Sequence, residues 1–301
     1  MTSDKLIITA ASKAYGPSLL ALLGSLTLNW PEHPPVLVYD IGLDEATLAT
    51  LAEHQIPVKK VPPFCPHWRK YFTWKIWCIN DAPALDVLWL DAALVVLKPL
   101  EEVFDALAHQ GYFLVPNYQL LDWEASEAAC SGCGVPAEFR LGKLTLPTGL
   151  MGFRKNGKAK LVLEEALSVA LVEKHIAATE PTHRYDQGII SLLMHKHFGR
   201  VIPADGIIYL GWRSPVQAHG QKIWAHRRGM LAEDKAFFAS HISTAGKPYC
   251  PKDPAKHKPK LTPRLFVMKC YRFAKRLGQA ALTFPSPKRS NPIYDGVRES
   301  C

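Results

Sequence analysis

Short apolar runs alternate with longer segments of helical periodicity along most of the chain. Runs at residues 6–10, 36–39 and 58–61 are typical of buried strands, and helix-like segments at 17–28 and 44–54 separate them. Asp44 and Glu45 are suited to the start of the second helix, as a cap and a first-turn acid. This alternation predicts an α/β fold with a mostly parallel central sheet and crossover helices.

The same alternation continues beyond residue 70 without an internal repeat or a change of composition before residue 250. We therefore expect one domain at 1–250 and a separate tail at 251–301. The further expected elements are an aromatic-rich helix to 79, a strand ending at Asp91, a run at 94–97, a helix at 100–109, a strand at 149–153, and helices at 159–175 and 187–198.

Asp91 is the strongest candidate for a functional residue. It ends the apolar run Val87-Leu88-Trp89-Leu90, where a buried strand reaches the surface. A carboxylate is costly to place beside a buried strand, and open α/β sheets bind ligands at the carboxyl ends of their strands. The alternative is a turn aspartate between two strands, because aspartate is common in turns. Trp74, Trp77 and Trp89 are expected in the core.

The net charge of +9 is unevenly distributed. Residues 251–301 hold 12 Lys and Arg against 3 Asp and Glu, so the rest of the chain is neutral. On a helical wheel over 264–282, the rings of Phe266 and Phe273 lie on one side and cations such as Arg272 on another. This pattern is typical of an interfacial helix on an anionic membrane, or of a helix packed on its own domain. Nucleic-acid binding is disfavoured, since such proteins usually carry their charge on the folded face.

Other composition features indicate a cytoplasmic protein, peripheral at the inner face of the membrane. No run of about 18 uncharged apolar residues occurs, and no apolar signal segment precedes the first strand. The seven cysteines are odd in number and scattered, which suits a reducing compartment. Only Cys130 and Cys133 have metal-like spacing, and we expect a loop with two unpaired thiols there rather than a zinc or redox site.

Several short motifs, each weak alone, follow one another in an order that resembles a known family. The chain is similar over roughly residues 6 to 250 to the GT-A glycosyltransferases of the family-8-like group, which includes glycogenin and bacterial lipooligosaccharide galactosyltransferases. The motifs are residues 8–15, Val38-Tyr39-Asp40-Ile41-Gly42-Leu43, Thr73-Trp74-Lys75-Ile76, Trp89-Leu90-Asp91, Thr148-Gly149-Leu150-Met151, Tyr185-Asp186-Gln187, and Ser240-His241 followed by Lys247-Pro248-Tyr249.

The resemblance implies a GT-A nucleotide-sugar-binding fold and a role for each matching residue. Thr9, Ala10 and Tyr15 would hold the nucleoside, with Tyr15 as the stacking ring. Asp186 and Gln187 would orient the donor sugar and act at the anomeric carbon. The remaining donor-binding residues would be Lys75, Asp91, Gly149, His241 and Lys247, of which Lys75 and Lys247 neutralise the leaving group. Asp186 as a helix cap and His241 as a polar loop residue are the simpler alternatives.

The family holds a divalent ion, Mn²⁺ or Mg²⁺, with two aspartates and the late histidine, and this chain departs from that pattern. Asp91 and His241 match two of the ligands, but Ala93 stands at the second aspartate position. Charge develops on the diphosphate as its bond to the sugar breaks, so the site must supply cations. Our hypothesis is that Lys75 and Lys247, with Arg184 or the basic cluster at 226–228, take over part of this neutralisation.

We therefore expect a glycosyltransferase that moves a sugar from a nucleotide-diphosphate donor, by default a UDP-hexose, to a lipid-linked or surface glycan. The alternative is a catalytically lapsed GT-A domain that binds a glycan or nucleotide as a partner in an assembly. The missing carboxylate at Ala93 favours the alternative, and the Asp-Gln and His-Lys-Pro elements favour the enzyme. The dinucleotide-binding class is disfavoured because the first turn lacks the glycine-rich motif.

Overall fold

The computed structural model describes residues 4–177, 183–210, 220–226 and 229–242. Its central sheet has six strands in the order β3-β2-β1-β4-β7-β6. Strands β3, β2, β1 and β4 are parallel neighbours, while β7 runs antiparallel to both β4 and β6. The bounds are β1 Lys5–Ala11, β2 Val36–Asp40, β3 Val58–Lys60, β4 Asp86–Leu90, β6 Tyr112–Leu114 and β7 Leu150–Arg154.

A smaller sheet extends the structure beyond the end of β4. Its order is β5-β9-β8, with β9 antiparallel to β5 and parallel to β8. The bounds are β5 Leu94–Val96, β8 Ile208–Leu210 and β9 Ile223–Ala225. The turn between β4 and β5 contains Asp91, so the first functional candidate lies where the chain passes from one sheet to the other.

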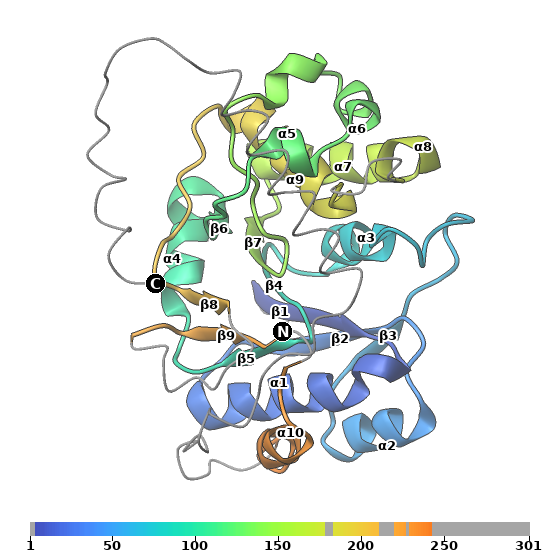
Figure 1. Cartoon of the computed structure of the whole chain (residues 1–301). Coiled ribbons are helices and arrows are strands. Elements are labelled where there is room, and N and C mark those ends of the chain that lie inside the picture. The colour runs from blue at the N-terminus through green and yellow to red at the C-terminus, as the bar shows by residue number, and fades with distance from the viewer. Residues whose placement is uncertain (1–3, 178–182, 211–219, 227–228, 243–301) are drawn as a thin grey trace. The chain divides into compact units, whose positions relative to one another are not determined.

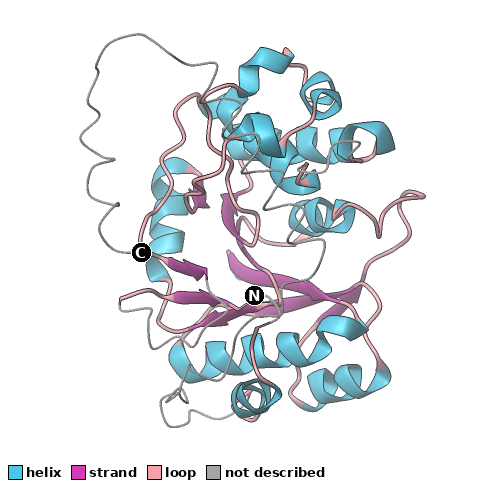
Figure 2. Cartoon of the chain, viewed as in Figure 1, coloured by secondary structure: helices cyan, strands magenta, loops and turns pink. Residues whose placement is uncertain are grey.

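Helices cover both faces of the central sheet (Figures 1 and 2). On one face lie α1, α2 and α10, and on the other α3, α7 and α9. The bounds are α1 Gly16–Asn29, α2 Glu45–Glu53, α3 Thr73–Asp81, α4 Glu101–Gln110, α5 Leu121–Glu124, α6 Glu127–Gly132, α7 Gly157–Ala170, α8 Glu173–Ile176, α9 Tyr185–Phe198 and α10 Ala232–Ala239.

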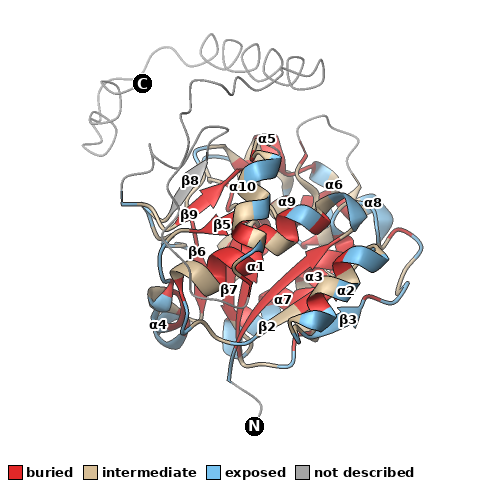
Figure 3. Ribbon diagram, turned by 90° about the horizontal axis from the view of Figure 1, so that it is seen from below, coloured by how far each residue is buried: buried red, intermediate tan, exposed pale blue. Residues whose placement is uncertain are grey.

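The burial pattern explains why these segments form two apolar layers. Along β1, Leu6, Ile8 and Ala10 join a core cluster with α3, α7 and α9, while Ile7 joins the cluster that contains Leu22 of α1. A strand presents alternate side chains to opposite faces, so a continuous apolar run is buried on both. Buried residues accordingly fill the sheet and the helix surfaces that face it (Figure 3).

The expected α/β fold with a mostly parallel sheet is confirmed, and most predicted elements agree with the observed bounds. Asp44 caps α2 as predicted, because its carboxylate accepts a hydrogen bond from the Thr47 amide at 3.0 Å. Trp74 and Trp89 are buried in the core, and Trp77 is partly buried against it. The predicted domain boundary at residue 250 and the tail over 251–301 lie outside the described residues and stay predictions.

Two predictions were wrong. The segment 159–175 is not one helix, because α7 ends at Ala170 and the short α8 begins at Glu173. The ring of His67, far away in sequence, donates to the Ala170 carbonyl at 2.8 Å and replaces an amide of the missing turn. Cys130 and Cys133 lie in α6 and at its C-cap rather than in a loop, and both are buried. Burial raises the pKa of Cys133 to about 12.

Within the ranges that the structure describes, no helix is both long and apolar enough to cross a membrane. The amphipathic segment 264–282 is not among those ranges, so its attachment to a membrane surface remains a prediction.

Candidate functional site

The site lies at the carboxyl ends of β1 and β4, where the strand order reverses. Strand β2, which follows β1 in the chain, lies on one side of β1, and β4 lies on its other side. Such a switch point is where open α/β sheets bind ligands, because the two crossovers leave the strand ends uncovered. Asp91 directly follows β4 here, and its amide donates to the Gly149 carbonyl at 2.8 Å, which continues the β4–β7 ladder by one pair.

Lys75 brings two carboxylates together at this edge. Its ammonium nitrogen Nζ lies 2.9 Å from Oδ1 of Asp91 and 3.4 Å from Oδ2 of Asp186. It also donates to the Thr148 carbonyl at 3.2 Å. We call Lys75, Asp91 and Asp186 the charged cluster. Its members come from α3, from the end of β4 and from the first turn of α9, so three distant segments of the chain meet at one point.

Burial differs sharply within the charged cluster. The side chain of Lys75 is 4% exposed and that of Asp186 is 6% exposed, whereas Asp91 is 37% exposed. Asp91 is therefore the most exposed member of the charged cluster. The indole Nε1 of Trp89 donates to Asp91 Oδ1 at 2.8 Å, so this oxygen is held by Trp89 and Lys75. The second oxygen, Oδ2, lies toward Gly149, where a Cβ atom would approach it to 3.2 Å.

The electrostatics of the charged cluster keep Lys75 protonated. Burial alone would lower the pKa of Lys75, but the carboxylates of Asp186 and Asp91 outweigh burial and raise it. Burial raises the pKa of Asp186, and the attraction of Lys75 and a hydrogen bond with Thr148 only partly compensate. With all three groups ionised, one ammonium faces two carboxylates, so the charged cluster carries a net charge of −1.

Asp186 is not the cap of α9. The helix begins at Tyr185, and the side chain of its N-cap residue, Arg184, makes no capping hydrogen bond. Asp186 lies in its first turn, where a carboxylate is favoured by the positive end of the helix dipole. Its buried Oδ2 makes the ion pair with Lys75 without a well-aligned hydrogen bond. The carboxylate is therefore placed for the charged cluster rather than for the helix end.

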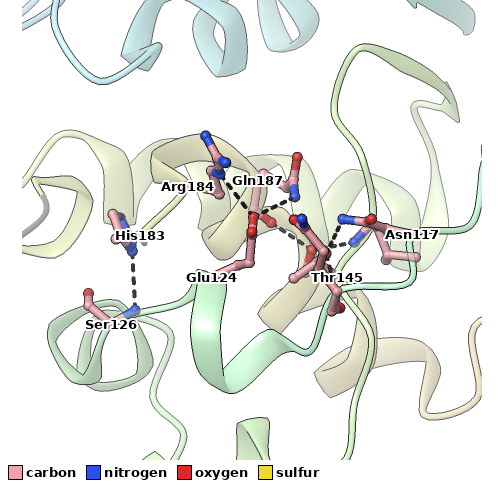
Figure 4. Close-up of polar contacts among 10 residues, drawn as sticks. Asn117, Glu124, Ser126, Thr145, His183, Arg184 and Gln187 are labelled. Atoms are coloured by element: carbon pink, nitrogen blue, oxygen red, sulfur yellow. Dashed lines mark hydrogen bonds and ion pairs between the residues drawn. The ribbon is translucent and has the colours of Figure 1, made fainter. Parts of the chain in front are cut away.

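Gln187, the next residue, belongs to a different network, centred on Glu124 of α5. The Glu124 side chain is 2% exposed, and its Oε2 accepts from Arg184 Nε at 3.2 Å and from Gln187 Nε2 at 3.1 Å. Figure 4 shows both side chains reaching toward this carboxylate. Close approach of the helices requires Gly188, since a Cβ there would lie 2.9 Å from the Glu124 carbonyl. The sequence offered no signal for Glu124.

The residues expected to hold the nucleoside lie along β1 and just after it. Thr9 and Ala10 are buried in the strand, and Thr9 Oγ1 has no hydrogen-bond partner within the described part of the chain. Tyr15 ends the 3-10 turn Lys13–Tyr15 and is partly buried against a cluster that contains Ala92 and Ile242. In this cluster, the end of β1 packs together with the turn after Asp91 and with the segment after α10.

His241 follows α10, and its partner Lys247 lies outside the described residues. The ring nitrogen Nδ1 of His241 donates to the Phe237 carbonyl at 2.7 Å, and the two rings lie 4.7 Å apart. The adjacent Ile242 packs in the same cluster as Ala92, next to Asp91. The packing of Ile242 thus places His241 near this edge of the sheet, and the His241 Nδ1 atom is occupied by its hydrogen bond to Phe237.

The side chains that the structure describes do not fit the divalent ion implied by the family resemblance. Among them, no three His, Cys, Asp or Glu residues gather in a way that could hold a metal ion. Asp91 Oδ1 is engaged by Lys75 and Trp89, and the residue two positions further is Ala93. Two carboxylates are present in the charged cluster, but the cation between them is the ammonium of Lys75.

Comparisons with known proteins identify the fold. No protein-family model and no curated protein matches the sequence. Among solved structures, the galactosyltransferase LgtC, in complex with donor and acceptor sugar analogs, aligns over 80% of this chain and 98% of its own, with a TM-score of 0.50 and 15% identity. The apo bifunctional glycosyltransferase WbbM aligns over 81% of this chain and 50% of its own, with a TM-score of 0.54 and 13% identity. The chain has the GT-A fold of these glycosyltransferases.

Proposed function

We propose that the protein is a glycosyltransferase that moves a sugar from a nucleotide-diphosphate donor, by default a UDP-hexose, to a glycan or lipid-linked acceptor. The observation that carries this proposal is the charged cluster at the β1–β4 switch point of a GT-A fold. A buried ammonium between two carboxylates contributes little to stability compared with an apolar core, so its presence at a strand edge favours a functional role.

The charged cluster suits the sugar better than the diphosphate. With all three groups ionised, its net charge of −1 repels phosphate, whereas the exposed carboxylate of Asp91 can accept hydrogen bonds from sugar hydroxyls. Lys75 already pairs with two carboxylates, so its role is to hold Asp91 and Asp186 together in a fixed geometry. This arrangement preorganises the acceptors and avoids reorganisation when the donor binds.

Cations outside the charged cluster must then neutralise the negative charge of the leaving diphosphate. Arg184 is a candidate because its side chain is 40% exposed beside Gln187, with Nε held by Glu124. Lys247 and the basic residues at 227–228 are further candidates by sequence. In this scheme Thr9, Ala10 and Tyr15 hold the nucleoside, and Asp186 and Gln187 face the anomeric carbon. Neutralisation by side chains rather than by an ion is consistent with Ala93 at the second aspartate position.

Release of UDP, GDP or CMP from a panel of nucleotide sugars tests this proposal. Turnover of one donor, lost in Asp91→Asn but retained in the exposed control Asp105→Asn on α4, would support it. Binding of a donor without turnover of any would indicate a catalytically lapsed domain instead. Absence of binding across the panel would contradict both functions.

Membrane-surface attachment through 264–282 belongs to the same proposal, because a lipid-linked acceptor lies at a membrane. The rings and cations of this segment suit anionic headgroups. Co-sedimentation of the full chain with phosphatidylglycerol vesicles, weakened by salt and absent with phosphatidylcholine, is the expected result. Equal binding to both vesicle types would contradict an electrostatic attachment.

A further inference from the structure

Three aromatic side chains lie together at the starts of α3 and α9. Tyr185 has its ring centroid 5.4 Å from that of Tyr71 and 6.0 Å from that of Phe72. Phe72 is 45% exposed, and the two tyrosines are partly buried. We call Tyr71, Phe72 and Tyr185 the aromatic platform. An exposed ring such as that of Phe72 is unusual for packing alone, because large rings normally lose most of their surface to the core.

The backbone of the aromatic platform is strained. The φ angles of Tyr71, Phe72 and Tyr185 are 57°, 59° and 37°, in the left-handed region where bulky side chains are rarely found. A glycine would adopt these angles without strain. Since Phe72 is 45% exposed, packing in the core does not explain a phenylalanine at such a position. Strain of this kind concentrates at functional sites.

The aromatic platform adjoins the charged cluster. The Phe72 ring centroid lies 5.4 Å from Lys75 Nζ, and Tyr185 directly precedes Asp186. A ligand on the exposed part of the Phe72 ring would therefore lie close to the groups proposed to hold the donor sugar. Tyr71, the other tyrosine of the aromatic platform, is oriented by a hydrogen bond, in which its Oη donates to Glu173 Oε1 at 3.3 Å.

We propose that the aromatic platform binds a pyranose ring of the acceptor, an inference that rests on the proposed function. A pyranose has one face made mainly of C–H groups, which packs well on an aromatic ring because the ring face is electron-rich. Its hydroxyl edge would remain available to polar groups beside it. Stacking on Phe72 would place an acceptor hydroxyl next to a donor sugar held at Asp91.

The variant Phe72→Gly separates this role from a structural one. It relieves the left-handed strain but removes the ring's contacts with Trp74 and Tyr185, so these opposing effects should leave the protein folded with only a modest change in melting temperature. Binding of glycosides should weaken on the order of tenfold, from the loss of stacking and buried ring area. Gln55→Gly is the matched control, because Gln55 has a φ of 55° and is exposed without an aromatic ring.

Saturation-transfer NMR on the full chain, with methyl β-galactoside, methyl β-glucoside, lactose and cellobiose as probes, gives the binding readout. Nucleotide release from the donor in the absence of acceptor is measured in parallel. The inference predicts strongly weakened glycoside signals in Phe72→Gly, whereas Gln55→Gly should keep wild-type glycoside signals and wild-type donor hydrolysis. Glycoside signals equal to wild type, or no signal from any probe with the wild-type protein, would overturn it. Absence of donor binding would instead overturn the proposed function, whatever the glycosides do.

Discussion

The side-chain amide of Gln187 donates to the buried carboxylate of Glu124 at 3.1 Å, and this contact fixes which end of the amide is presented to the site. An ionised carboxylate only accepts hydrogen bonds, so the NH₂ group must face Glu124 and the carbonyl oxygen must face away. The Gln187 carbonyl oxygen therefore points away from Glu124, and under the proposed function it would act as a hydrogen-bond acceptor toward the donor sugar.

Glu124→Gln should disturb this orientation without removing the side chain. A glutamine can present either its carbonyl oxygen or its NH₂ group to Arg184 Nε and Gln187 Nε2, so it no longer fixes which end of the Gln187 amide faces it. We expect kcat to fall on the order of 10²-fold with little change in KM for the donor, because a small misplacement near the reacting atoms is costly. Steady-state kinetics measures both constants.

The matched control is Glu127→Gln. Glu127 also pairs with an arginine, Arg140, at 3.4 Å, but its side chain is 73% exposed. Exposed pairs contribute about 0–1 kcal/mol, so this variant should behave as wild type. Equal kinetics in Glu124→Gln and Glu127→Gln would contradict a positioning role for Glu124.

Lys75→Met should destabilise the protein strongly. It leaves Asp91 and the buried Asp186 facing each other without the ammonium between them. Removing one partner of a buried ion pair costs about 3–5 kcal/mol, because a buried charge remains uncompensated. Urea unfolding monitored by tryptophan fluorescence gives this free energy.

Lys59→Met provides the comparison for Lys75→Met. Lys59 pairs with Asp81 at 2.8 Å, but its side chain is 47% exposed, so the expected loss is about 0–1 kcal/mol. A loss in Lys75→Met as small as that in Lys59→Met would show that the charged cluster is well solvated and would weaken the argument for preorganisation.

The sequence predicts much of this fold because its strands are apolar runs and its helices begin with recognisable signals, as at Asp44. It also places Asp91 at a strand end. It does not reveal that Lys75 lies between Asp91 and Asp186, because α3 and α9 are far apart in the chain. Nor does any local pattern mark Glu124, whose role comes entirely from contacts with another helix.

Asp186→Asn should change how stability depends on pH. The pKa of Asp186 is raised in the folded protein, mainly by burial, above its ordinary value of 3.8. The folded state therefore binds this proton more tightly than the unfolded state does. The contribution of Asp186 to stability is fully present below pH 3.8 and is lost as the pH rises through the folded pKa.

The free energy of unfolding of both proteins, measured from acid to neutral pH, checks this sign. We expect the difference, wild type minus Asp186→Asn, to decrease as the pH rises, since an asparagine does not titrate. A difference that increases over this range would mean that the attraction of Lys75 outweighs burial, and that the pKa of Asp186 is lowered instead.

Ala93→Asp should introduce the metal dependence that we do not expect of the wild-type protein. Ala93 is partly exposed in the turn after β4, where the Leu94 amide donates to the Asp91 carbonyl at 3.0 Å. A carboxylate two residues after Asp91 restores the second aspartate of the pattern that the chain resembles, and oxygen ligands are what Mn²⁺ and Mg²⁺ prefer. Isothermal titration with the best donor from the panel, with Mn²⁺ or with EDTA, measures the effect.

For the wild-type protein, donor affinity with EDTA should stay within about twofold of that with Mn²⁺, because side chains rather than an ion are proposed to neutralise the diphosphate. A twofold shift corresponds to under about 0.5 kcal/mol. Ala93→Asp should bind the donor more tightly with Mn²⁺ than with EDTA. Ala93→Asn, whose side chain has the shape of aspartate, should show little difference between Mn²⁺ and EDTA, because its amide carries no charge. Donor binding by the wild-type protein that EDTA abolishes would contradict charge neutralisation by side chains alone. In that case the ion would be held by ligands outside the charged cluster.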